Sequence, residues 1–98
     1  MALTHILYSP GEIASQIAEN AKRLRLSKNL SRRTLAQKSG VPESNIKRFE
    51  TTGKISLDGL LLIAICLGAE EPLTNLFAAT PALTLQELKN YERARGRQ

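Results

Sequence analysis

A short polar run in the middle of the chain surrounds one apolar residue with hydrogen-bond donors, acceptors and cations. Between Pro42 and Phe49 the apolar side chain is Ile46, and every other side chain is polar. A helix that recognises DNA bases needs this mixture on its outward side, because each base pair presents its own pattern of donors and acceptors in the major groove. The candidate base-reading residues are Glu43, Ser44, Asn45, Lys47 and Arg48.

Positive charge is concentrated around this run. The chain of 98 residues has a formal net charge of +5. Residues 22–54 hold ten Lys and Arg against two Glu and so carry +8, whereas residues 1–21 carry −2 and residues 55–98 carry −1. Such a window favours a polyanionic partner, although a solvated charged face has the same composition. Cations near a helix start suit phosphates, which makes Ser31, Arg32 and Arg33 candidate phosphate contacts.

Other kinds of chemistry lack the residues they need. With one Cys, Cys66, no internal disulfide forms, and with one His, His5, no zinc site of ordinary spacing can be assembled. The chain has no glycine-rich phosphate loop and no carboxylate pair at a plausible helical site, so we expect neither an enzyme nor a bound cofactor. Cys66 lies within an apolar run, which favours a core thiol over a reactive one.

No segment has the pattern of a membrane span or a secretion signal. The longest apolar run, Leu60 to Leu67, is eight residues long, whereas a membrane-spanning helix needs roughly 18 to 20. The N-terminus lacks a basic leader followed by an apolar stretch. We therefore expect a cytoplasmic protein that does not enter a membrane.

The elements that would hold the polar run begin with a long helix. Ser9 and Glu12 have capping-box spacing, and Pro10 suits the first helical position, so a helix is expected from here to about Ser27 or Lys28. Helical spacing predicts a buried stripe, with the cations largely outside it. The stripe is Ile13, Ile17, Ala21 and Leu24, and the cations are Lys22, Arg23 and Arg25.

Two short helices are expected next, joined at a glycine. Ser31 is an N-cap for a helix over residues 32–38, and Gly40 can adopt the positive φ of a tight turn after it. A second helix should run from Pro42 to about Glu50, and residues 51–54 should form a loop. The expected inward residues are Leu35, Ala36, Ile46 and Phe49.

Further helices follow, so we expect an all-α bundle of five to six helices. Ser56 can cap a fourth helix that Gly68 ends, and Glu71 with Pro72 opens a short fifth one. The expected buried stripe of the fourth helix is Leu57, Leu60, Leu61, Ala64 and Leu67, with Leu62 and Ile65 outside it. We expect the chain to have three parts. Residues 1–8 form an N-terminal arm or strand, and residues 9–79 form the main domain. Residues 80–98 form a C-terminal helix, from Leu85 to about Arg93, and a tail.

Two short helices joined at a glycine inside the basic window match a helix-turn-helix, whose second helix enters the major groove. Residues 13–78 also resemble the lambda-repressor and Cro-like (XRE) helix-turn-helix family. The residues that carry the resemblance are Leu35, Ala36, Gly40, Val41, Ile46, Phe49 and Glu50. It implies that Glu43, Ser44 and Arg48 face base edges, with Asn45 and Lys47 as base or phosphate contacts. It also implies that Ser31, Arg32, Thr51, Thr52 and Lys54 hold phosphates.

A narrower resemblance concerns the residues before the first helix. Ile6 to Pro10 is similar to the opening of HipB-type antitoxins, the DNA-binding partners of HipA-type kinase toxins. Phage repressors and restriction-modification controllers share the same helical core, so these remain alternative identities.

Two functional hypotheses follow. The first is a dimeric repressor on a palindromic operator, because one such module contacts a half-site; it would be an autoregulating antitoxin. The second is a protein-interaction module that sequesters a toxin or another partner, with DNA binding secondary. Spare apolar residues are interface candidates in both, unless they fill a small core. They are Leu62, Ile65, Leu73, Leu76, Phe77, Leu83, Leu85 and Leu88.

Overall fold

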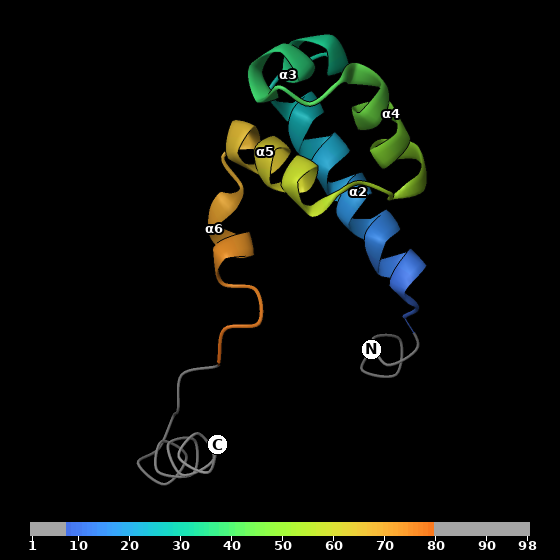
Figure 1. The fold of residues 1–98 in the computed structure, drawn as a ribbon, viewed down its shortest axis with the longest axis vertical. Helices are drawn as coiled ribbons and strands as arrows, with labels where there is room; N and C mark the ends of the chain where they lie inside the picture. The colour runs from blue at the N-terminus through green and yellow to red at the C-terminus, as the bar shows by residue number, and fades with distance from the viewer. Residues whose placement is uncertain (1–7, 80–98) are drawn as a thin grey trace, which may run out of the picture.

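The computed structural model describes residues 8–79, and within this range the chain forms five helices and no strand (Figure 1). The expectation of an all-helical architecture is confirmed for this part. The helices are α2 (Pro10–Ser27), α3 (Arg32–Ser39), α4 (Glu43–Thr52), α5 (Leu57–Leu67) and α6 (Glu70–Thr74). Apart from Tyr8, the expected arm or strand lies outside the described residues, and so does the expected C-terminal helix.

The long helix α2 is the support on which the other helices are arranged. α4 and α5 both pack against α2, and α3 packs against α4 and α5. α6 packs against α5, and in Figure 1 it follows α5 to the side of the molecule away from α4. The polar helix α4 is therefore fixed from two sides, by α2 and by α3.

Helix ends follow the capping signals. The Ser9 hydroxyl accepts from the backbone N–H of Glu12 at 3.1 Å, and the Glu12 carboxylate accepts from the backbone N–H of Ser9 at 3.3 Å, which completes the capping box. Ser31 and Ser56 cap α3 and α5 in the same way, by accepting from Thr34 and Gly59. The expected starts of α2, α3 and α5 are confirmed.

Gly53, in the turn between α4 and α5, lies close to the backbone of α2. Its φ of +79° lies in the left-handed region, which residues with a side chain adopt at a cost. A Cβ placed there would lie 3.0 Å from the carbonyl carbon of Ala14. The turn therefore rests directly on the backbone of α2.

One core joins α2, α3, α4 and α5, and two expected stripes are corrected. The core residues are Ala18, Leu35, Val41, Ile46, Phe49, Ile63 and Leu67. On α5, Leu57 and Leu61 are exposed and Ile63 is buried, because α5 turns the side that carries Gly59, Ile63 and Leu67 toward α2 and α3. On α2, Ile13 and Ile17 are exposed and Ala18 is buried, because the side of the helix that carries Ala14 and Ala18 faces the turn at Gly53 and the core.

A third correction concerns the expected loop over residues 51–54. α4 continues through Thr51 and Thr52 because Gly53, with its left-handed φ, is the residue that ends the helix. The hydroxyls of both threonines donate to carbonyls one turn earlier, from Thr51 to Lys47 and from Thr52 to Arg48, both at 2.7 Å. α4 ends at Gly53, whose backbone N–H donates to the Phe49 carbonyl.

None of the helices in residues 8–79 is both long enough and apolar enough to cross a membrane.

Candidate nucleic-acid interface

The outward face of α4 carries the residues expected to read bases. Ile46 and Phe49 point into the core and are 0% and 2% exposed. The polar residues between and before them are all exposed, so one short helix presents a continuous surface of donors, acceptors and charges. These residues are Glu43, Ser44, Asn45, Lys47 and Arg48. That these residues contact bases stays a prediction.

The turn between α3 and α4 is held by local hydrogen bonds. Gly40 has φ +81°, and its N–H donates to the Ala36 carbonyl at 2.9 Å. The Val41 N–H donates to the buried hydroxyl of Ser39 at 3.1 Å, and the Val41 side chain enters the core. Pro42 then presents its carbonyl to the N–H of Ile46 at 3.1 Å. These contacts fix the direction in which α4 leaves α3.

A buried carboxylate joins the three helices of this region. Arg25 of α2 donates to both oxygens of Glu50 on α4, from Nε at 2.7 Å and from Nη2 at 3.0 Å. Arg32 of α3 donates from Nε to Oε1 of Glu50 at 2.8 Å. Arg25 also donates from Nη1 to the Leu30 carbonyl at 2.7 Å, which ties down the connection between α2 and α3.

The protonation of Glu50 reflects this environment. Its side chain is 3% exposed. Burial by itself raises the pKa of this carboxyl group, but the hydrogen bonds and positive charges of Arg25 and Arg32 outweigh that effect, so the pKa lies below its usual value. Glu50 is therefore a carboxylate at neutral pH, and it neutralises charge inside the basic window.

This ion-pair cluster changes the assignment of two basic residues. Arg25 is buried, so it contributes nothing to the surface, contrary to its expected place outside the buried stripe. Arg32, a candidate phosphate contact, directs its Nε to Glu50, although a third of its side chain remains exposed. The helical spacing of Arg25 and of Glu50 from buried apolar residues could have indicated that both lie on buried faces. Arg25 follows Ala18 and Ala21 at helical intervals, and Glu50 lies one turn after Ile46, so both fall on buried faces.

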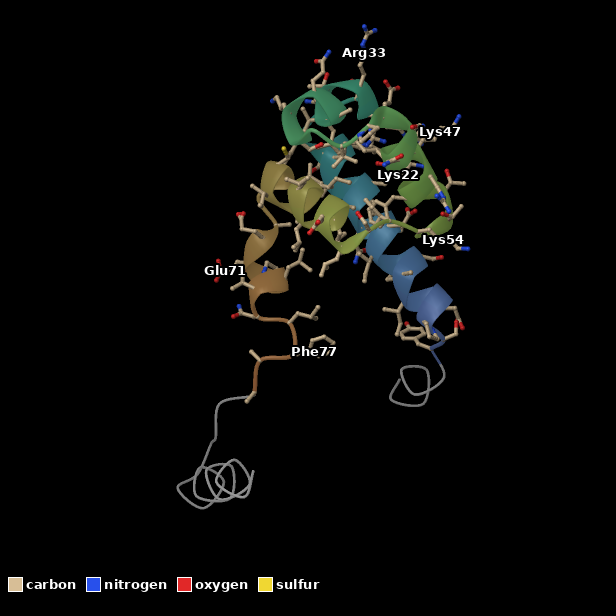
Figure 2. All side chains as sticks on the ribbon, viewed as in Figure 1. Lys22, Arg33, Lys47, Lys54, Glu71 and Phe77 are labelled. Atoms are coloured by element: carbon tan, nitrogen blue, oxygen red, sulfur yellow. The ribbon has the colours of Figure 1, made fainter. Side chains whose placement is uncertain are left out.

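The other candidate phosphate contacts differ in how free their polar groups are. Arg33 and Lys54 are exposed and reach into solvent from α3 and from the residues after α4 (Figure 2). The Ser31 hydroxyl caps α3 and donates to Thr34 Oγ1 at 3.0 Å. The hydroxyl protons of Thr51 and Thr52 are donated to carbonyls of α4. The two cations are thus better placed than the three hydroxyls to donate to a phosphate.

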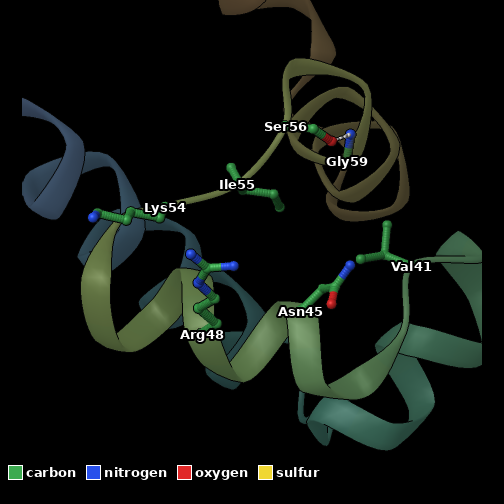
Figure 3. Close-up of a pocket in the computed structure, with 7 residues that line it drawn as sticks. All are labelled: Val41, Asn45, Arg48, Lys54, Ile55, Ser56 and Gly59. Carbon is green, nitrogen blue, oxygen red and sulfur yellow. Dashed lines mark hydrogen bonds between the residues drawn. The ribbon is translucent and has the colours of Figure 1, made fainter.

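A hollow of about 350 Å³ separates α4 from the start of α5 (Figure 3). Arg48 points from α4 toward it, and Lys54 and Asn45 lie on its border. At the opposite side is Ser56, the N-cap of α5. The guanidinium of Arg48 and the positive end of the α5 dipole favour an anion in this hollow. Arg48, expected to read bases, is therefore also within a surface suited to phosphate.

The expected interface residues lie on another part of the molecule. Leu62 and Ile65 are 45% and 60% exposed on the outer side of α5. Leu73 is half-buried on α6, and Leu76 and Phe77 follow it, with Phe77 98% exposed. Leu83, Leu85 and Leu88 lie outside the described residues.

Comparison of the chain with protein-family models, with curated proteins and with solved structures found no match. A function for this chain is therefore inferred from the arrangement of its own residues.

Proposed function

We propose that the chain is a sequence-specific repressor that binds double-stranded DNA as a dimer, with α3 and α4 acting as a helix-turn-helix. The observation that carries this proposal is the division of α4. Its apolar residues are fully buried, while its five polar residues in positions 43–48 are all exposed on a helix held by α2 and α3. A helix placed in the major groove has to be rigidly supported on one side and chemically varied on the other.

The positions of the exposed cations also support α4 as the helix that faces the DNA. Arg33, Lys38, Lys47 and Lys54 are exposed on α3, on α4 and on the residue after the α4 end. Cations on both sides of the polar face of α4 would contact the two phosphate backbones that border a groove. In this orientation Arg33 and Lys54 bind phosphates, and Glu43, Ser44 and Arg48 face bases.

A dimer is part of the proposal because one module reaches one half-site, and a palindromic operator presents two. The exposed side chains of Leu62 and Ile65 on α5 are the proposed contact between the subunits. The similarity of Ile6 to Pro10 to HipB-type antitoxins adds a HipA-type kinase toxin as a second partner and autoregulation of a toxin-antitoxin operon as the biological role.

The test starts from selection of duplexes from a random pool by the full chain. Arg48→Ala should relax the preference at one base position of the selected sequence, with a loss of about 1–3 kcal/mol in discrimination. Arg33→Ala should weaken binding to selected and random duplexes alike, because a phosphate contact carries no sequence information. Arg33 is the suitable phosphate variant because, unlike Arg32, it makes no ion pair with Glu50.

Two results would contradict this proposal. One is recovery of no preferred sequence from the pool. The other is an equal effect of Arg48→Ala and Arg33→Ala on selected and random duplexes. A salt series adds an independent criterion, since raising salt from about 50 to about 200 mM should reduce affinity by about tenfold or more.

A second candidate function is a protein-interaction module, and the exposed apolar residues of α5 and of the segment after α6 favour it. Binding of a protein partner through those residues would survive both Arg33→Ala and high salt. Loss of partner binding in Phe77→Ser, with operator binding retained, would assign the two functions to separate surfaces.

A further inference from the structure

An open apolar groove lies between α2, α5 and α6. It encloses about 280 Å³, and apart from Asn20 its lining side chains are apolar. Ile17 and Leu24 contribute from α2, Leu60 from α5 and Leu73 from α6. None of these residues belongs to the surface that we propose for DNA.

The described residues leave this groove incompletely covered. Ile17 remains 40% exposed, and α6 is five residues long with no buried residue. Phe77, in the turn after α6, extends away from the ribbon (Figure 2). Covering apolar surface is worth roughly 25 cal/mol per Å², so a groove of this kind favours an apolar occupant.

The chain beyond Ala79 has the composition of such an occupant. Residues 80–98 include Leu83, Leu85 and Leu88. An extended chain spans about 3.3 Å per residue, so the first of these leucines lies within about 13 Å of Ala79. One wall of the groove is formed by α5, whose 11 residues span about 16 Å at 1.5 Å per residue. The distance that the chain can cover after Ala79 is similar to the length of this wall, so the leucines can reach the groove.

Charge favours the same occupant. Residues 55–79, which form α5 and α6, contain three carboxylates and no Lys or Arg. These are Asp58, Glu70 and Glu71. Residues 89–98 contain four cations, Lys89, Arg93, Arg95 and Arg97, against Glu92. A basic segment is thus attracted to the acidic elements that border the groove.

We infer that residues 80–98 fold back onto the α2, α5 and α6 groove of their own chain. In this arrangement Leu83, Leu85 and Leu88 enter the groove, and the cations after them lie along its acidic border. The occupied groove completes the apolar face that the described residues leave open.

The test uses the full chain with Cys66→Ala and Asn90→Cys, a nitroxide spin label on the new cysteine, and isotope-labelled methyl groups. The methyl signals of Ile17, Leu24, Leu60 and Leu73 should broaden strongly, and reduction of the nitroxide should restore them. They should stay broadened after dilution into a large excess of unlabelled protein that carries no nitroxide. A label at Lys38→Cys on α3 is the matched control, and it should leave these methyl signals sharp.

A pair of substitutions on α2 identifies the groove itself. Ile17→Gln should reduce the broadening from the label at residue 90, because Ile17 lines the groove. Leu26→Gln removes a comparably exposed aliphatic side chain from the same helix, outside the groove, and should change nothing. Sharp groove signals in the labelled chain would overturn the inference. Loss of the broadening on dilution would also overturn it, because the occupant would then be a second copy.

Discussion

The region around α3 and α4 and the region around α5 and α6 leave opposite kinds of surface to solvent. In the first, the apolar residues of α4 are buried and a carboxylate is buried with them between two arginines, while cations and amides face outward. In the second, aliphatic side chains such as Ile65 and the aromatic ring of Phe77 face outward. The first region therefore exposes a polar and charged surface, and the second exposes an apolar one.

The largest expected effect tests whether the first region depends on its buried charge. Glu50→Ala leaves Arg25 buried without its partner and should lower the free energy of unfolding by about 3–5 kcal/mol. Glu43→Ala removes an exposed carboxylate from the same helix and should change it by no more than about 0.5 kcal/mol. Urea denaturation measures both. Equal stabilities of the two variants would show that the cluster is not what holds α2, α3 and α4 together.

The next effect concerns the turn that connects the two regions. Gly53→Ala should lower the free energy of unfolding by about 2–3 kcal/mol, because it combines a φ of +79° with a contact of 3.0 Å to the Ala14 backbone. Gly40→Ala has almost the same φ but open space around the new methyl group, so it should cost about 1 kcal/mol. Thermal unfolding measures the stability of both variants. A larger loss of stability in Gly40→Ala than in Gly53→Ala would contradict the prediction.

Acid should weaken the first region through Glu50. Because the pKa of Glu50 is lower in the folded chain than its usual value of 4.5, its stabilisation is complete above that value. It is lost as the pH falls through the lower pKa of the folded state. Arg32→Ala removes one hydrogen bond to Glu50 and should reduce this loss. Urea midpoints across the acid range measure the difference, and an unchanged pH profile in Arg32→Ala would assign the shift to Arg25 alone.

The smallest effect on stability is expected in the second region. Leu62→Ser with Ile65→Ser should change the stability of the subunit fold by about 0.5 kcal/mol or less, since both side chains are exposed. The same double variant should convert a dimer into a monomer at micromolar concentration, as measured by light scattering. Leu26→Ser, on the exposed side of α2, is the control and should remain dimeric. A monomeric wild type would remove the proposed subunit contact.

Local signals in the sequence predicted most of the helical framework. The helix ends depend on hydrogen bonds or backbone angles that involve residues only a few positions apart. The serine caps are Ser9 with Glu12, Ser31 and Ser56, and the left-handed glycines are Gly40 and Gly68. The exposure of the α4 polar face also followed from spacing, because Ile46 and Phe49 are apolar residues in a polar run. Such features need no information about distant parts of the chain.

Contacts between distant segments were the part that spacing missed. The run from Leu60 to Leu67 is apolar throughout, so polarity does not indicate its buried side, which is set by the packing of α5 against α2 and α3. The pairing of Arg25 with Glu50 joins residues 25 positions apart. A cation and a carboxylate read separately look like surface residues, and burial becomes favourable only when they meet.

The alternation of buried and exposed positions along α4 has a consequence for how recognition changes over generations. Ile46, Phe49 and Glu50 hold the helix in place, whereas the five polar positions between 43 and 48 make no contribution to the core. Substitutions at those five positions can accumulate without compensating changes elsewhere. In the proposed repressor, a duplicated copy of the chain can therefore acquire a new target sequence while its fold is retained, and a library restricted to these positions would sample DNA specificity at nearly constant stability.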